Sequence, residues 1–311
     1  MIQDMKKMYH LLYHLPNRLH ACHTRLFMTT VFLLAIAMHA NATAQEGNII
    51  IIDGERWTLL NEPIYADTAL FHRMKAALPA DRSWTTANWD GYTSYWSIRQ
   101  GSLMLDSICV TFYNEETEQF RQATLDESWM KALFKDYTRN KGFKAVLFSG
   151  KLRVTRGECI HYVHDGYESS FEYETFFTVK AGKVTERKDY HNRLIEGCSF
   201  GKSKDLIASL KEKLLLQAEK YPELNEAKRI VFSIKNVKLD ATGTITDCTV
   251  KALKNGSDDI AKEMKRIIMD IHPWETLYLY DEYVFPERGG YTFPITISKY
   301  DVVKGKKGKK M

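Results

Sequence analysis

Short strand-like runs separated by tight turns containing glycine recur along this chain of 311 residues. The turn pairs are Asp53-Gly54, Gln100-Gly101, Asp165-Gly166, Ala181-Gly182 and Thr242-Gly243. Glycine adopts the positive φ of a tight hairpin without steric cost. Several of the flanking runs alternate apolar and polar residues, as strands with one buried face do. The pattern therefore predicts antiparallel sheets.

Amphipathic helices interrupt the strands. The apolar spacing and the capping residues Asp67, Asp126 and Ser257 predict helices over 66–79, 125–139 and 257–271. A further helix is expected over 202–221 and should be the longest, because Leu206, Leu210, Leu214 and Ala218 keep the i, i+4 spacing. Residues 143–154 and 159–184 are strand-rich. These elements predict an α+β fold.

We expect the fold to be divided in two. Residues 45–200 form an α+β domain with an antiparallel sheet and helices. Residues 201–301 form a second domain with a smaller antiparallel sheet and helices. Residues 302–311 are a lysine-rich tail, KGKKGKK at its core, which we expect to be a solvated end.

The N-terminal 44 residues have the features of a signal peptide. Basic residues precede the apolar run Leu26–Met38, and Ala42-Thr43-Ala44 supplies the small residues that a signal peptidase needs. We expect cleavage between Ala44 and Gln45, which makes the protein periplasmic or otherwise exported. The alternative is an uncleaved inner-membrane anchor, because the uncharged stretch 26–45 is about long enough to span a bilayer.

Net charge gives no indication of nucleic-acid binding. The basic balance of the whole chain comes from its two ends, since residues 45–303 hold 35 basic and 38 acidic side chains. A nucleic-acid-binding domain usually has a clear excess of basic residues. Membrane contact is expected only through the signal segment or the lysine tail. The sequence leaves the oligomeric state open.

No chemical motif indicates catalysis, a cofactor or a metal. Cys159, His161 and His164 form C-x-H-x-x-H, but alternation on a strand separates His164 from the other two. Four cysteines follow the signal segment: Cys109, Cys159, Cys198 and Cys248. An exported chain permits disulfides among them, and the sequence does not choose a pairing. We expect no catalytic residue, no metal ligand and no cofactor.

Aromatic residues are concentrated in 84–96. Trp84, Trp89 and Tyr92 fall within nine residues of one loop-like segment. Rings on a loop offer a large contact area at low entropic cost, and such a platform suits sugars or peptides. An alternative function is therefore a carbohydrate- or peptidoglycan-binding protein or hydrolase. The structural alternative is that rings at the start of the following strand only fill a core.

The C-terminal part resembles the TonB C-terminal domain family over about residues 220–298. The resemblance lies in the order of its motifs, which are Tyr221-Pro222-Glu223, Val231-Phe232-Ser233-Ile234, Leu239–Gly243, Ile245–Val250, the helix Ile260–Met269, Pro273-Trp274 and Tyr291–Ile297. Residues 93–113 also resemble uncharacterised bacterial domains, which imply no function.

The TonB resemblance implies a small sheet backed by helices, no catalysis, and a partner in the envelope of a Gram-negative bacterium. Family members bind an extended segment of an outer-membrane protein by β-augmentation, in which backbone hydrogen bonds give affinity and alternate side chains give specificity. The partner-binding strand maps to Tyr291, Thr292, Phe293, Pro294, Ile295, Thr296 and Ile297. Pro294 suits an edge strand because it has no N–H to donate.

Two features depart from the family. A folded domain stands where an energy transducer has a Pro-rich linker, and 275–288 is an insertion before the last strand. The sequence therefore favours an exported, non-catalytic envelope protein that binds another envelope protein through its edge strand. The alternative is a membrane-anchored, TonB-type energy transducer, if the N-terminal segment is uncleaved.

Overall fold

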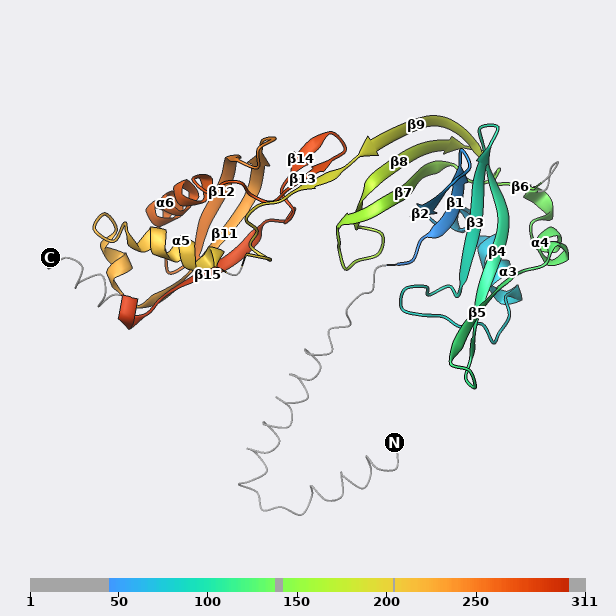
Figure 1. Ribbon diagram of the computed structural model, residues 1–311, viewed down its shortest axis with the longest axis horizontal. Coiled ribbons are helices and arrows are strands. Elements are labelled where there is room, and N and C mark those ends of the chain that lie inside the picture. Colours follow the sequence, from blue (N-terminus) through green and yellow to red (C-terminus); the bar gives the residue numbers. More distant parts are fainter. Residues whose placement is uncertain (1–44, 138–141, 204, 302–311) are drawn as a thin grey trace, which may run out of the picture. The chain divides into compact units, whose positions relative to one another are not determined.

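The computed structural model describes residues 45–137, 142–203 and 205–301 (Figure 1). The predicted signal segment and lysine tail lie outside these residues. The described chain combines helices with mainly antiparallel sheets, so the predicted α+β class is confirmed. The first sheet departs from the prediction of antiparallel pairing at one place, because residues 49–51 pair with residues 95–97 in parallel. Its buried apolar side chains form two clusters. One contains residues between Ile50 and Val184, and the other contains residues between Cys198 and Ile297.

A nine-stranded sheet forms the first part. Its strands are β1 (Asn48–Ile52), β2 (Glu55–Leu59), β3 (Tyr92–Arg99), β4 (Ser102–Asn114), β5 (Gln119–Thr124), β6 (Phe143–Lys144), β7 (Gly150–His161), β8 (Ser170–Lys180) and β9 (Lys183–His191). The order is β3-β1-β2-β7-β8-β9-β4-β5, with β6 on β4. Strand β4 pairs with β9 and also with β3, the first strand in this order, so the sheet closes on itself.

The predicted hairpins are present with the expected turn chemistry. Gly54, Gly101 and Gly182 have positive φ, and so do Asp53, Gln100 and Ala181 before them. Positive φ at both central residues is what a two-residue type I′ turn requires. A bulge lies between Leu105 and Ile108, where the β3–β4 register shifts and the parity of the apolar residues of β4 changes.

Helices cover the core of the first part, and one of them is shorter than predicted. Helix α3 (Thr68–Ala77) begins after Asp67, whose side chain accepts from Leu70 N, and α4 (Glu127–Leu133) begins after Asp126. The two short 3-10 helices are η1 (Pro63–Ala66) and η2 (Lys135–Tyr137). The prediction of a helix over 125–139 was wrong at its end, because α4 stops at Leu133 and buried Phe134 caps it.

The strand-rich segment 143–154 is not continuous. Strand β6 has only two residues, and β7 begins at Gly150. Between them the chain turns, with Phe148 N bonded to Ala145 O, and Ala145 and Phe148 both contact the core. The apolar pattern of residues 143–154 therefore did not indicate this turn.

The C-terminal part is a three-stranded antiparallel sheet with two helices on one face. Its elements are α5 (Leu206–Leu215), η3 (Pro222–Asn225), β11 (Lys228–Leu239), β12 (Ile245–Lys254), α6 (Asp258–Met269) and β15 (Tyr291–Ile297). The strand order is β12-β11-β15. The prediction that the helix within 202–221 is the longest was wrong, because α5 has 10 residues and α6 has 12.

The insertion 275–288 forms a hairpin of its own. Strands β13 (Thr276–Leu279) and β14 (Glu282–Val284) pair with each other, and β13 pairs with β10 (Arg193–Ile195). The turn residues Tyr280 and Asp281 both have positive φ. This type I′ turn contains no glycine or asparagine, so this hairpin was not predicted from the sequence.

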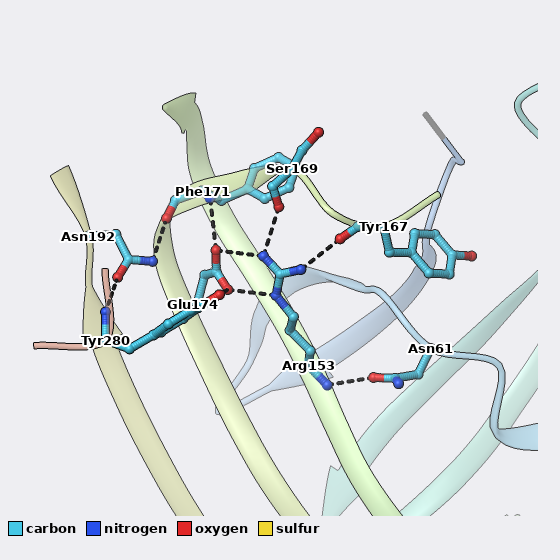
Figure 2. Close-up of polar contacts among 8 residues, drawn as sticks. All are labelled: Asn61, Arg153, Tyr167, Ser169, Phe171, Glu174, Asn192 and Tyr280. Atoms are coloured by element: carbon cyan, nitrogen blue, oxygen red, sulfur yellow. Dashed lines mark hydrogen bonds and ion pairs between the residues drawn. The ribbon is translucent and has the colours of Figure 1, made fainter. Parts of the chain in front are cut away.

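The Tyr280 side chain reaches a buried ion pair of the first sheet (Figure 2). Arg153 of β7 and Glu174 of β8 form two hydrogen bonds, with Nε–Oε2 2.6 Å and Nη2–Oε1 2.8 Å. The Tyr280 hydroxyl donates to Glu174 at 2.7 Å, and Tyr280 N donates to Asn192 Oδ1. The Arg153 guanidinium also donates to the carbonyls of Tyr167 and Ser169. The hairpin and the sheet are therefore joined by a largely satisfied polar network.

Candidate functional site

The predicted partner-binding strand, β15, is an edge strand. All seven of its residues pair with β11, from Tyr291 opposite Ile234 to Ile297 opposite Lys228. Along the described chain no other strand pairs with β15. Phe293, Ile295 and Ile297 are buried, while Thr292, Pro294 and Thr296 are exposed. One edge of this strand is therefore available for an added strand.

Two observations show which backbone groups point outward. Strand pairing continues through Pro294, which has no N–H to give β11. In addition, the Arg229 carbonyl accepts from Asn255 Nδ2 at 2.9 Å, on the β12 side of β11, so the Arg229–Thr296 pair is a non-hydrogen-bonded one. Thr292, Pro294 and Thr296 therefore direct their backbone groups to the free edge.

The free edge offers three carbonyls and two N–H groups, because Pro294 has no N–H group.

The C-terminal end of β15 is fixed, because Asp301 accepts from Ser298 and pairs with Lys211 Nζ of α5 at 2.8 Å. These contacts, with the Lys211 ammonium foremost, lower the pKa of Asp301 to about 2. The edge is thus held in place at neutral pH. An arrangement of backbone donors and acceptors can bind an extended chain but has no nucleophile or general acid.

The second candidate surface is the loop 83–91, where Trp84 and Trp89 lie side by side. Their rings are stacked with centroids 6.2 Å apart, and the side chains are 65% and 63% exposed. Thr85 and Asn88 pair across the turn between them. Asn88 Oδ1 accepts from Gly91 N, and Nδ2 donates to Tyr92 O. The role of Asn88 was not predicted from the sequence, although asparagine after a short polar run is typical of a turn.

Tyr92 was wrongly predicted as a member of this platform. It begins β3 opposite Val110, and the alternation of that strand directs its ring into the core, where it is 5% exposed. Its hydroxyl is among the buried polar atoms without a partner. Only the two tryptophans form an exposed surface.

A buried carboxyl lies behind this loop. Glu62 accepts from Tyr167 Oη at 2.8 Å and from Asn48 Nδ2 at 2.9 Å. Burial raises its pKa above the usual value in spite of these hydrogen bonds, and the charge of Asp90 adds to the effect. Asp90 itself is held by Tyr65 and Lys75. The carboxyls of Glu62 and Asp90 both have hydrogen-bond or ion-pair partners in the protein. These contacts therefore stabilise the packing of β1, β3 and the loop.

The described residues contain no group of three or more histidine, cysteine or carboxylate side chains that could hold a metal ion. Cys109, Cys159, Cys198 and Cys248 are free thiols. No helix within 45–137, 142–203 and 205–301 is long and apolar enough to cross a membrane.

Comparison with known proteins gave no relative, because no family model, no curated protein and no solved structure matches the chain.

Proposed function

We propose that this is an exported, non-catalytic envelope protein that binds an extended segment of another envelope protein along the outer edge of β15. The observation that carries this proposal is an edge strand whose exposed residues all direct backbone groups outward. Strand addition satisfies those groups and gives affinity without a pocket. The order α5, β11, β12, α6, β15 supports it, because it is the order of elements in the TonB C-terminal domain family that the sequence resembles.

Removing the outward donors should abolish binding. We expect the double substitution Thr292→Pro and Thr296→Pro to reduce capture of the envelope partner at least tenfold, because it removes the two N–H groups that remain beside Pro294. The bonds between β15 and β11 use the intervening residues, so the fold should persist. The measurement is pull-down from solubilised envelope with quantitative mass spectrometry, beside a circular dichroism melt.

The matched control is Thr292→Val with Thr296→Val, which changes the same side chains and keeps both N–H groups. It should capture the partner as the unaltered protein does. Undiminished capture by a folded double-proline variant would overturn the proposal.

The exposed tryptophan pair supports a second function, recognition of sugar rings in the envelope. Trp84 and Trp89 form an open aromatic surface on a turn held by its own hydrogen bonds. Such a surface is ready before the ligand arrives, which lowers the entropic cost of binding. The flat apolar face of a pyranose ring packs on indole, and a buried tryptophan contact is worth about 2 kcal/mol or more.

Trp89→Ala should therefore weaken binding to a peptidoglycan-fragment array about thirtyfold, which corresponds to that 2 kcal/mol. Phe120→Ala is the control, because Phe120 is also 63% exposed but lies on β5. Equal signals from the Trp89→Ala protein and the unaltered protein, or from an array that binds neither, would count against sugar recognition.

A further inference from the structure

The face of the three-stranded sheet opposite its helices is basic. Ile230, Phe232 and Ile234 of β11 are buried in the core, so alternation directs Arg229 and Lys235 to the opposite face. On β12, Lys254 lies opposite Val231 and Lys251 lies opposite Ser233, which places both on the same face. All four cationic side chains are exposed.

These cations lack counter-charges in the described part of the chain. None of the four takes part in an ion pair there, and β15 contributes only Thr292, Pro294 and Thr296 to this face. Several carboxylates of the C-terminal part form ion pairs with other cations. These pairs include Asp247 with Lys265, Asp259 with Lys262, Glu263 and Asp270 with Arg266, Glu275 with Lys202 and Asp301 with Lys211.

The positive charge is therefore local. Residues 45–303 carry a small excess of acidic side chains, so the basic face does not follow from overall composition. Unpaired like charges on one face repel one another, and an oppositely charged partner reduces that repulsion. The charge of this face specifies the chemistry of what covers it.

We propose that the segment captured along β15 is acidic, with aspartate or glutamate at alternate positions directed over this basic face. This inference rests on the proposed function, since it places the segment on the β15 edge. It adds the side-chain chemistry by which the partner is chosen. The main chain supplies affinity, and the charges supply the selection of sequence.

The geometry allows these charges to meet. Strands lie about 4.8 Å apart, so an added strand is about 10 Å from β11. Threonine and proline on β15 are short and leave the space above that strand open to the long side chains of Arg229 and Lys235. Side chains on one face of a strand recur about every 6.7 Å. An alternating acidic segment presents carboxylates with that same spacing.

An acidic protein segment fits better than a single-stranded nucleic acid. Binding of single strands combines a basic groove with aromatic rings on which the bases stack. The residues that form this face are arginine, lysine, threonine, serine, valine and proline, with Asp247 of β12 at one end, where it is paired with Lys265. Tyr291 at the start of β15 stacks on Phe200 and is half-buried. The face has charge but no stacking platform.

The test is fluorescence anisotropy with the purified full chain and labelled ten-residue peptides. One peptide alternates valine with glutamate, and the others alternate valine with glutamine or with lysine. We expect the glutamate peptide to bind at least tenfold more tightly than the other two, and less tightly at high salt because salt screens exposed charges. Arg229→Gln with Lys251→Gln should weaken its binding about tenfold, as two exposed ion pairs of up to about 1 kcal/mol each allow.

The matched control is Lys220→Gln with Lys262→Gln. It changes the net charge equally, but Lys220 and Lys262 lie on the helix side, beside Glu263 and Asp259. It should leave binding of the glutamate peptide unchanged. Equal binding of all three peptides, or tighter binding of a twelve-nucleotide oligothymidylate than of the glutamate peptide, would overturn the inference.

The double-proline variant at Thr292 and Thr296 separates the two proposals. If prolines abolish capture of the native partner and Arg229→Gln with Lys251→Gln does not, the edge-strand function stands and the acidic chemistry is wrong. If binding of the glutamate peptide is weakened by Arg229→Gln with Lys251→Gln and is unchanged in the double-proline variant, acidic side chains bind the basic face without strand addition. That result overturns both proposals.

Discussion

Arg153→Met should lower the free energy of unfolding by about 3–5 kcal/mol, the usual cost of removing one partner of a buried ion pair. Glu174 is fully buried and the Arg153 side chain is 17% exposed. Without the guanidinium, the carboxylate keeps hydrogen bonds from Phe171 N and Tyr280 Oη but loses its only counter-charge in the network of Figure 2. Urea unfolding followed by circular dichroism measures the loss.

Two further variants make this prediction specific. Arg153→Met combined with Glu174→Leu should recover part of the lost stability, because no buried charge is then left alone. Arg187→Met is the surface control, since its partners Asp53 and Asp189 are 77% and 58% exposed. Exposed pairs contribute about 0–1 kcal/mol. A loss for Arg153→Met no larger than for Arg187→Met would show that the network does not stabilise the fold.

Trp274→Ala should also cost about 3–5 kcal/mol, as expected for deletion of a large buried aromatic side chain. Trp274 is completely buried, packs on Phe200 and Phe285, and donates from Nε1 to Ile268 O at 3.2 Å. Its backbone N–H donates to Gly243 O at 2.7 Å, which links it to the turn between β11 and β12. Differential scanning calorimetry measures the effect.

The control for Trp274→Ala is Trp89→Ala, which removes the same side chain from an exposed position and should change stability by at most about 0.5 kcal/mol. Trp274→Phe should lose less than the alanine variant because it retains most of the ring contacts. Similar stability for the Trp274→Ala and Trp89→Ala proteins would contradict the role given to Trp274.

The Gly243 turn serves the core rather than a binding site. Gly243 has φ +76°, and an added Cβ would lie 2.6 Å from Trp274 O. Only glycine permits this approach of the turn to the Pro273-Trp274 segment. The sequence pattern around residues 239–250 is therefore explained by packing, and the free edge of this sheet at β15 lies on the other side of β11.

Local features of the fold were predictable because their causes are local. Asp67, Asp126 and Ser257 cap helices through bonds to residues three positions away, and glycine turns depend on two backbone conformations. The edge position of β15 was predictable from one proline and the family resemblance. In each case the determinant lies within a few residues of the feature.

Features that depend on pairing across the chain were not predictable. The Arg153–Glu174 pair, the Tyr280 contact 106 residues from Glu174, and the basic face all follow from strand register, which the sequence does not give. The prediction that Tyr92 belongs to the aromatic platform was wrong for a similar reason, since only the β3–β4 register shows that it faces the core. The β13–β14 hairpin was missed because its turn contains no glycine and because tyrosine, here Tyr280, is uncommon at a turn position with positive φ.

The placement of that hairpin has a mechanical consequence. Six residues, 285–290, connect β14 to β15. A pulling force along β15 would act on its seven pairs with β11 simultaneously, in shear. Tension in the chain before β15 would pass through β14 to the Tyr280 turn, which is hydrogen-bonded to the charged network in the first sheet. A load on β15 would then be shared by both sheets.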